Sequence, residues 1–258
     1  MIQRFTPIEE KRNLTLSADQ IDSFNKNGFV IIRGLYTEEE IELIINLRDE
    51  SERKVQVNGE SFKIDRAFYD VEKVRDIESE KSVTLRKIQE VYSSESDFRK
   101  VSSSNKILDI VQDLIGDTIY YHSSKLMCKN PGGRRKPWHQ DYAYWPDMNN
   151  TNQVTVWAAI EPSTRENGCI QIIPGSHKRG LIDHYQGEDY MINEDNIENE
   201  NIEYAVMEPG DILFFNVLAL HASDPNCSDK PRLATIIDFD SNPKPHAAEY
   251  GDEQPLRC

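Results

Sequence analysis

The chain has 258 residues, enough for one large domain with a substantial core, and it is acidic, with a formal net charge of −15. Nucleic acids and anionic membranes bind basic surfaces, so we expect neither as a main partner. No apolar run reaches the roughly 18 residues of a membrane-spanning helix, and the first residues do not resemble a signal peptide. The sequence therefore predicts a soluble, cytoplasmic protein and leaves its oligomeric state open.

Residues 1–116 are predicted to be mainly helical. A capping box at Ser17-Ala18-Asp19-Gln20 begins a short helix that stops at Asn27-Gly28. Phe29–Ile32 follows as a strand that is apolar enough to be buried on both faces. A second capping signal at Thr37 begins another helix, and a third apolar stripe is closed by Gly116.

The segment Val55–Ser104 is polar and mixed in charge, with scattered apolar residues. We predict loops and short helices here, lying over a core made elsewhere.

After Gly116 the sequence changes to short β-rich runs separated by turn signals such as Pro174-Gly175. The predicted strands are Thr118–Cys128, Gln153–Ile160, Cys169–Ile173, Glu203–Met207, Asp211–Phe215 and Leu233–Phe239. Helices first and many strands afterwards favour a mainly β sandwich or jelly roll, supported by the N-terminal helices. We predict one domain over residues 1–258, with the β core at 117–240 and a loosely ordered tail at 241–258.

An acidic segment, Tyr185–Asn201, interrupts the predicted strands. It is predicted to be a long surface loop, either a solvated insertion or a mobile lid over a ligand site.

Two side chains in Trp138-His139-Gln140-Asp141 are suited to bind a metal. His139 and Asp141 are separated by one residue, and on an extended strand such side chains point to the same side. A second histidine, His221, would complete two imidazoles and one carboxylate, the set that occupies one face of iron(II) and leaves the opposite face open. One HxD motif alone is a weak signal, so the assignment depends on the motifs that follow it in the chain.

Those motifs, in this order, resemble the phytanoyl-CoA dioxygenase family of iron(II)- and 2-oxoglutarate-dependent oxygenases. The resemblance covers Tyr121–Phe239. The matching stretches are Trp138-His139-Gln140-Asp141, Trp157-Ala158-Ala159-Ile160-Glu161, Asn167-Gly168-Cys169, Pro174-Gly175-Ser176-His177, Gly210-Asp211, and His221-Ala222-Ser223 with Arg232.

The resemblance implies a double-stranded β-helix, the cupin-like jelly roll, with His139, Asp141 and His221 as iron(II) ligands. By the same likeness Arg232, helped by the Ser223 hydroxyl, holds the distal carboxylate of 2-oxoglutarate. A planar guanidinium suits this role because it donates two parallel hydrogen bonds. Trp157 matches a position that lines the cosubstrate pocket in related enzymes, although a buried core tryptophan is an equal alternative.

The implied reaction consumes O2 and 2-oxoglutarate, hydroxylates a small-molecule substrate and releases succinate and CO2. The carboxylate of Asp141 favours oxidation over halogenation, because related halogenases have a small residue there. Desaturation, cyclisation and epoxidation use the same ligands and stay open. From a different class, a non-catalytic jelly-roll protein that retains a metal site is the alternative. Arg232 favours the enzyme, because metal binding alone does not need it.

A basic cluster precedes His139 in an otherwise acidic chain: Lys125, Lys129, Arg134, Arg135 and Lys136. It is either a solvated surface loop or a set of cations that attracts an anionic substrate or cosubstrate. The aromatic residues Tyr142, Tyr144 and Trp145 are candidates for an apolar wall, with ordinary packing as the alternative.

The remaining histidines are predicted to be structural. His177 is expected to hydrogen-bond within its loop, and His122, His184 and His246 have no partner at ligand spacing. The four cysteines, Cys128, Cys169, Cys227 and Cys258, form no CxxC pair, so we expect free thiols.

Overall fold

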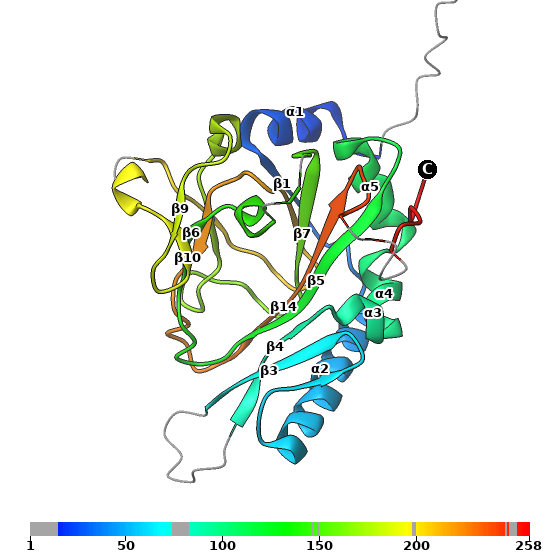
Figure 1. Ribbon diagram of the computed structural model, residues 1–258, viewed down its shortest axis with the longest axis vertical. Helices are drawn as coiled ribbons and strands as arrows, with labels where there is room; N and C mark the ends of the chain where they lie inside the picture. Colours follow the sequence, from blue (N-terminus) through cyan, green and yellow to red (C-terminus); the bar gives the residue numbers. More distant parts are fainter. Residues whose placement is uncertain are drawn as a thin grey trace, which may run out of the picture.

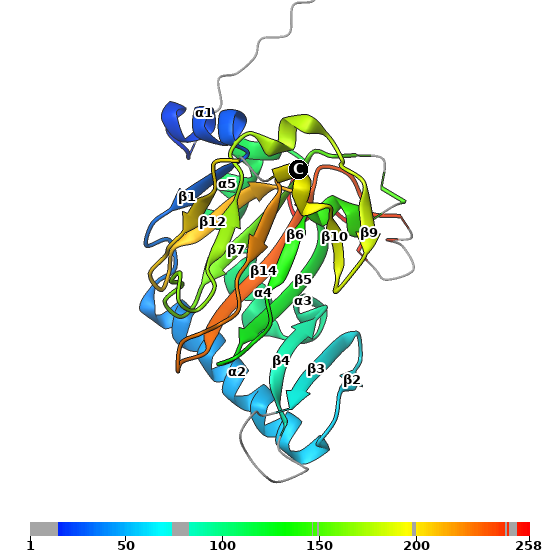
Figure 2. The same ribbon diagram turned by 90° about the vertical axis from the view of Figure 1, so that its left-hand side faces the viewer.

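Two β-sheets packed face to face form the centre of the protein (Figures 1 and 2). The computed structural model describes residues 15–73, 83–145, 147–148, 150–197, 200–245, 247 and 252–258. Within these residues the large sheet has the order β1 (Phe29–Ile32), β12 (Ile212–Asn216), β7 (Gln153–Ala159), β14 (Arg232–Asp240), β5 (Tyr120–Lys129), β4 (Val83–Gln89), β3 (Ala67–Lys73) and β2 (Phe62–Ile64). The small sheet has the order β11 (Glu203–Ala205), β8 (Ile170–Ile172), β13 (His221–Ser223) and β6 (Lys136–His139).

All strand pairs in the described residues are antiparallel, and successive strands alternate between the two sheets from β5 to β8 and again from β11 to β14, as in a jelly roll. The predicted strands after Gly116 are confirmed, with bounds that differ by a few residues. Assignment of the whole chain to one domain stays a prediction.

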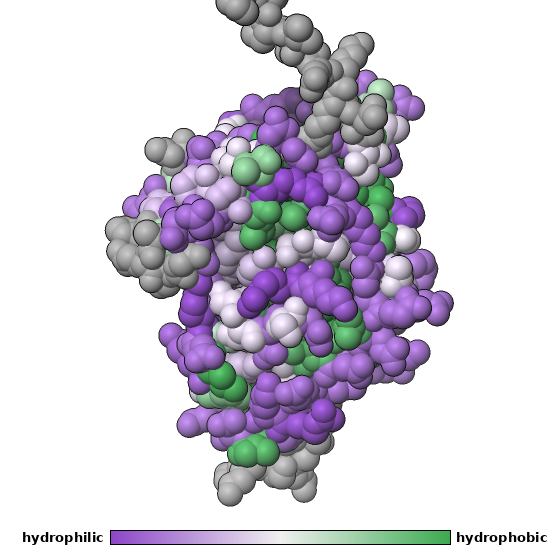
Figure 3. All heavy atoms as spheres, turned by 90° about the vertical axis from the view of Figure 1, so that its right-hand side faces the viewer, coloured by the Kyte–Doolittle hydropathy of each residue, from purple (hydrophilic) through white to green (hydrophobic). Residues whose placement is uncertain are grey.

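Helices cover the outer face of the large sheet, the face that does not meet the small sheet (Figure 1). They are α2 (Glu38–Asn58), α3 (Val91–Ser94), α4 (Ser96–Ser102) and α5 (Asn105–Ile115), while α1 (Ala18–Asn27) lies beside β1. Both capping boxes form as predicted, because the side chains of Ser17 and Thr37 accept hydrogen bonds from the backbone amides of Gln20 and Glu40. The face shown in Figure 3 is mostly hydrophilic, with apolar residues in separate patches.

The alternation of side chains along the central strands divides the interior into two cores. On β7, Val154 and Val156 pack with the helices, whereas Trp157 and Ala159 face the small sheet. Thr155 faces the same side as Trp157 and lines a pocket between the sheets. The large sheet therefore supplies a dry core on one face and a ligand site on the other.

The prediction of loops and short helices over Val55–Ser104 is confirmed for the short helices α3 and α4, but it is wrong for the loops, because α2 continues to Asn58 and β2, β3 and β4 extend the large sheet. Alternate side chains such as Tyr69 and Leu85 are buried, but charged residues stand between them. These charges pair across the strands, as Arg86 does with Asp70 at 2.6 Å. The local sequence consequently resembles a solvated loop, although β3 and β4 each bury some of their side chains.

Two smaller expectations also change. Phe29 and Val30 are buried, but Ile31 and Ile32 are only partly so, because β1 is the edge strand of the large sheet. The acidic segment Tyr185–Asn201 contains most of a hairpin, β9 (His184–Gln186) with β10 (Tyr190–Ile192), and a 3-10 helix, η3 (Glu194–Ile197).

The tail is ordered where it is described, so the prediction of a loose C-terminal tail is wrong there. Asp252 forms ion pairs with Arg66 at 2.9 Å and Lys244 at 2.8 Å, and the backbone of Arg257 pairs with Ile119. His246 lies outside the described residues. Among those that are described, no helix combines the length and apolar character that crossing a membrane requires.

Candidate active site

The HxD motif lies at the end of β6, where the chain leaves the small sheet. His139 is the last residue of the strand, and Asp141 is the first residue of the 3-10 helix η1 (Asp141–Tyr144), so the expected strand does not continue through both. Gln140 between them is still extended, with φ −118° and ψ 133°, and this conformation keeps both side chains on one side. The Gln140 amide fixes the corner by donating to the carbonyls of Gly180 and Leu218 at 2.8 and 2.7 Å.

His221 is brought to the same place by strand pairing. It begins β13, which pairs with β6 in a register that sets His221 directly opposite His139. The imidazole Nε2 atoms of His139 and His221 lie 3.6 and 3.7 Å from Asp141 Oδ1. One ligand atom from each of these residues lies within 4.8 Å of the others, so the three can hold one metal ion.

Hydrogen bonds on the far side of each ring fix the imidazoles for this role. His139 Nδ1 is 2.8 Å from the carbonyl oxygen of Pro137, and His221 Nδ1 is 3.0 Å from that of Ala219. A carbonyl can only accept, so each Nδ1 carries the hydrogen and each Nε2 keeps a lone pair for a metal.

The electrostatics of the set also suit a cation. Burial is the main cause that lowers the pKa of His221 to about 4, and the electrostatic effect of nearby His139 is the second. This ring is therefore neutral at pH 7. Burial alone would raise the pKa of Asp141, but the interactions with His221 and His139 outweigh it and hold this pKa well below its usual range. Two neutral imidazoles and one carboxylate are the donors expected for iron(II).

A hydroxyl and a buried acid support Asp141 from behind. Thr155 Oγ1 lies 3.0 Å from Asp141 Oδ2 and 2.7 Å from Asp238 Oδ1, and Ser123 donates to Asp238 at 2.5 Å. A hydroxyl has one hydrogen, so it can satisfy both carboxylates only if one of them is protonated. Burial raises the pKa of Asp238 to about 6, which makes Asp238 the carboxyl that keeps a proton more readily. Asp141 Oδ1 is left for the metal.

Arg232 begins β14 on the pocket face of the large sheet and is 3% exposed. It donates a short hydrogen bond to the carbonyl oxygen of Gly168, and its Nε has no hydrogen-bond partner among the described residues. Burial lowers its pKa to about 10, so it is still cationic at pH 7. Its guanidinium carbon lies 5.2 Å from the centre of the Trp157 ring, and both residues line the pocket. A buried cation with an unused donor is a site for an anion.

Ser223 lines the same pocket, but its hydroxyl already accepts a hydrogen bond from Lys129 Nζ at 2.8 Å. Lys129 is 9% exposed and stands directly opposite Arg232 in the β5–β14 register. Burial is the main cause that lowers the pKa of Lys129 to about 7, and the charge of Arg232 is the second. Two buried cations therefore stand at the end of the pocket where the sequence predicted one.

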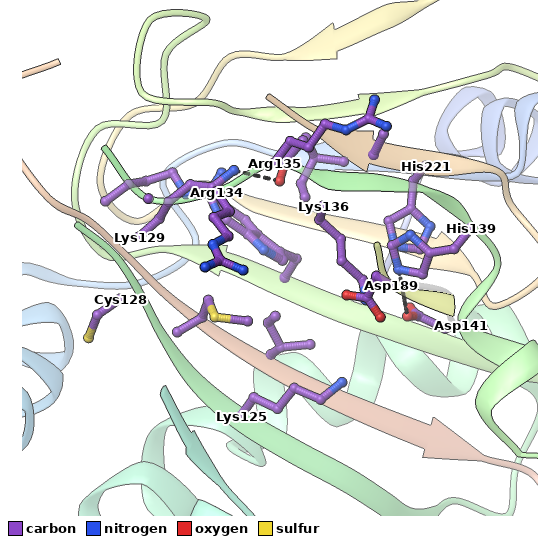
Figure 4. A pocket seen from close by; sticks show the side chains of 18 of the residues that line it. Lys125, Cys128, Lys129, Arg134, Arg135, Lys136, His139, Asp141, Asp189 and His221 are labelled. Atoms are coloured by element: carbon purple, nitrogen blue, oxygen red, sulfur yellow. Dashed lines mark hydrogen bonds and ion pairs between the residues drawn. The ribbon is translucent and has the colours of Figure 1, made fainter. Parts of the chain in front are cut away.

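The basic cluster is part of the pocket. All five of its residues line the pocket, with the metal-binding set at one end in the view of Figure 4. The solvated-loop alternative is wrong for Lys129, which is buried. Arg134 and Arg135 are exposed at the pocket rim.

Other candidates have structural roles. Tyr142, Tyr144 and Trp145 are not among the pocket-lining residues. The Tyr142 hydroxyl donates to the Met148 carbonyl, Trp145 packs edge-on against buried His122, and the exposed Tyr144 ring lies edge-on to His139 with ring centres 5.9 Å apart.

Two of the remaining histidines were also predicted to be structural. His184 Nε2 accepts a hydrogen bond from the backbone N–H of Gln140 at 3.0 Å. His177 Nδ1 is buried and, among the described residues, has no hydrogen-bond partner, so the expected bond within the loop is not made by this atom. All four cysteines are free, as predicted.

The sequence predicted no role for Thr155 or Asp238, and it indicated Lys129 only as one member of the basic cluster. The sequence does hold a signal for Asp238 and Lys129, because a charged residue inside a β-rich run is costly to bury without a function or a partner. Asp238 interrupts the apolar end of β14, and Lys125 and Lys129 occur at even spacing on β5, which puts both on one face.

Comparison with known proteins agrees with this geometry. A model of the phytanoyl-CoA dioxygenase (PhyH) family matches residues 24–234. The peroxisomal phytanoyl-CoA dioxygenase of Bos taurus is 32% identical over 244 residues, which cover 89% of this chain and 70% of the bovine protein. A probable alpha-ketoglutarate-dependent hypophosphite dioxygenase of Stutzerimonas stutzeri is 26% identical over 250 residues, which cover 93% and 85% of the two chains.

Among solved structures, EctD from S. alaskensis with bound Fe superposes with a TM-score of 0.69 at 20% identity, covering 92% of this chain and 79% of that one. This likeness supports the jelly-roll fold. The family match spans most of the chain, including His139, Asp141, His221 and Arg232. The protein belongs to the phytanoyl-CoA dioxygenase family.

Proposed function

We propose that the protein is an iron(II)- and 2-oxoglutarate-dependent dioxygenase that hydroxylates a small molecule. The overall reaction joins one oxygen atom of O2 to a C–H bond of the substrate and the other to 2-oxoglutarate, which leaves as succinate and CO2. One observation supports this proposal most strongly. The same pocket is lined by His139, Asp141 and His221 and by buried Arg232, whose Nε has no hydrogen-bond partner among the described residues.

The residues fit both groups. His139, Asp141 and His221 would hold iron(II) through three ligand atoms, and the ion would supply the activation of O2 together with the α-keto acid. Arg232 Nε and the Lys129 ammonium offer charge-assisted hydrogen bonds to a carboxylate at the other end of the pocket. Trp157 supplies a flat apolar wall beside Arg232 in the same pocket, which supports the cosubstrate role proposed for it.

The other residues of the site keep the ligands in position. The Pro137 and Ala219 carbonyls hold the two imidazole tautomers, and Thr155 holds one oxygen of Asp141. Such outer contacts set ligand orientation and metal affinity. The carboxylate of Asp141 occupies the position that a halide would need, which favours hydroxylation or a related oxidation over halogenation.

The partners of the proposed reaction are a small-molecule substrate, 2-oxoglutarate and O2. The overall charge of −15 supports the expectation that nucleic acid is not bound. A cytoplasmic location stays a prediction from the sequence.

Succinate release tests the proposal against the non-catalytic alternative. The protein is incubated in air with iron(II), 2-oxoglutarate and a panel of small molecules, and succinate and oxygen consumption are measured together. The proposal predicts equimolar succinate and oxygen use that requires iron, with a loss of at least about a hundredfold in His221→Ala because one ligand is gone. A metal-binding protein without catalysis would bind iron tightly yet release no succinate with any compound.

A further inference from the structure

The pocket contains more positive charge than iron and 2-oxoglutarate require. Its cationic lining residues are Arg86, Lys125, Lys129, Arg134, Arg135, Lys136 and Arg232. Lys129 and Arg232 lie together on the β5–β14 pair and suit one carboxylate. The remaining cations differ in whether a protein group already neutralises them.

Three of these cations are paired with carboxylates. Arg86 lies 2.6 Å from Asp70, Lys136 lies 2.5 Å from Asp189, and Arg135 binds Glu188 and Glu194. Asp189 and Glu188 belong to the turn between β9 and β10, so this hairpin is tied to the segment before His139. Ion pairs of this kind leave little charge for a ligand.

Lys125 and Arg134 are different, because neither makes a hydrogen bond or ion pair with any part of the chain that the structure describes. Lys125 is half-buried on β5 and lines the same pocket as His139, Asp141 and His221. Arg134 comes from the segment that leads into β6, in the opposite sheet. Figure 4 shows Lys125 on one side of the pocket and Arg134 to Lys136 on the other, with the metal-binding set beside them.

The charge balance then favours a second anion. 2-Oxoglutarate has two carboxylates. In the proposed function one binds the metal and the other binds Arg232 and Lys129. Lys125 and Arg134 remain without a hydrogen bond or ion pair among the described residues, so an anionic group in the pocket would accept charge-assisted hydrogen bonds from them. Cations that line a cleft also raise the local concentration of anions.

We propose that Lys125 and Arg134 bind an anionic oxyacid group of the substrate, a carboxylate, phosphonate or phosphate, and so place the rest of the molecule beside the metal. This inference rests on the proposed function, and it names the substrate class for that same site. The overall negative charge keeps bulk anions from the surface, while the pocket selects those that reach these two residues.

The inference is tested by calorimetric titration of the anaerobic protein, already loaded with iron(II) and 2-oxoglutarate, with inorganic phosphate and with propionate at low salt. At least one of these probes is expected to bind the wild-type protein. Lys125→Met and Arg134→Gln each weaken the binding of that probe at least about tenfold, the loss of one charge-assisted hydrogen bond. Lys125→Arg retains binding within about threefold, because it keeps the charge.

Arg86→Gln is the matched control, since it removes a cation of the same pocket that Asp70 already neutralises; it changes probe binding by less than about threefold. Affinity for 2-oxoglutarate is measured on every variant. If Lys125→Met and Arg134→Gln lose as much affinity for 2-oxoglutarate as for the probe, these residues serve the cosubstrate and the inference is overturned.

It is also overturned if neither probe binds the loaded wild-type protein, or if both variants bind the probe as tightly as wild type. Failure of the proposed function gives a different result, because 2-oxoglutarate itself would then not bind the iron-loaded wild-type protein. Arg134 is exposed, so its variant tests the inference even if Lys125→Met does not fold.

Discussion

Arg232 and Lys129 lie opposite each other on neighbouring strands, and both are buried without a carboxylate partner among the described residues. Burial lowers the pKa of both groups, and the charge of Arg232 lowers the pKa of Lys129 further. A carboxylate between them would counteract both effects. Binding of an anion beside these two cations is therefore favourable, and it depends on pH through the proton on Lys129, because the pKa of Lys129 is about 7.

Lys129 predicts how 2-oxoglutarate affinity depends on pH. The pKa of Lys129 is lowered from its ordinary value to about 7 in the free protein, so the ammonium is charged below pH 7 and neutral above it. An anion binds the charged form, so affinity is greatest below pH 7 and falls as pH rises, by up to about tenfold per pH unit. Anaerobic titration of the iron-loaded protein at several pH values measures this. Lys129→Met should be weaker at pH 6 and nearly independent of pH; an equally steep dependence in the variant would rule Lys129 out as its source.

At the scale of elements, the turn Asn167-Gly168-Cys169 connects the two sheets at the cosubstrate end. Gly168 has φ +74°, and its carbonyl oxygen accepts the hydrogen bond from Arg232. A Cβ there would overlap the carbonyl oxygen of Asp224 and lie 3.0 Å from Lys129 Nζ. The turn therefore needs glycine for two reasons, its left-handed backbone and the close approach of Asp224.

Gly168→Ala is expected to destabilise the protein by about 2–3 kcal/mol and to weaken 2-oxoglutarate binding, because the turn must move and carry Arg232 with it. Gly59→Ala is the matched control. Gly59 has nearly the same φ, +72°, but a Cβ would meet nothing within 4 Å, so it should cost only about 1 kcal/mol and leave 2-oxoglutarate affinity unchanged. Urea unfolding and anaerobic titration give the two quantities. Equal effects of the two substitutions on both would contradict this account of the turn.

At the scale of the whole molecule, the jelly roll and the ligand set follow from sequence patterns because those patterns are local. Strands with mainly apolar runs, such as β7, β12 and β14, are visible in a short window, and His139 with Asp141 is a motif of three residues. The family motifs then select His221 and Arg232. Strand pairing explains why these distant residues meet, since His221 is opposite His139 in the small sheet.

Other parts depend on contacts that a short window does not contain. β3 and β4 are hidden by charged residues that neutralise one another only after the strands pair, as Arg86 and Asp70 do. The ordered end of the tail depends on Asp252 meeting Arg66, 186 positions away. Lys129 looks like a surface lysine in the sequence because its burial follows from the position of Ser223 in another sheet. Whether Tyr185–Asn201 acts as a lid stays a prediction.

The most direct test of the central claim is anaerobic addition of 2-oxoglutarate to the iron(II)-loaded protein, followed by visible absorbance. Chelation of the metal by the keto acid gives a weak charge-transfer band in enzymes of this type. The account predicts the band in the wild-type protein, its absence in His221→Ala, and at least about a tenfold higher half-saturating concentration in Arg232→Ala, with no change in Arg99→Ala on the helical face. No band in the wild-type protein, or unaltered 2-oxoglutarate affinity in Arg232→Ala, would contradict it.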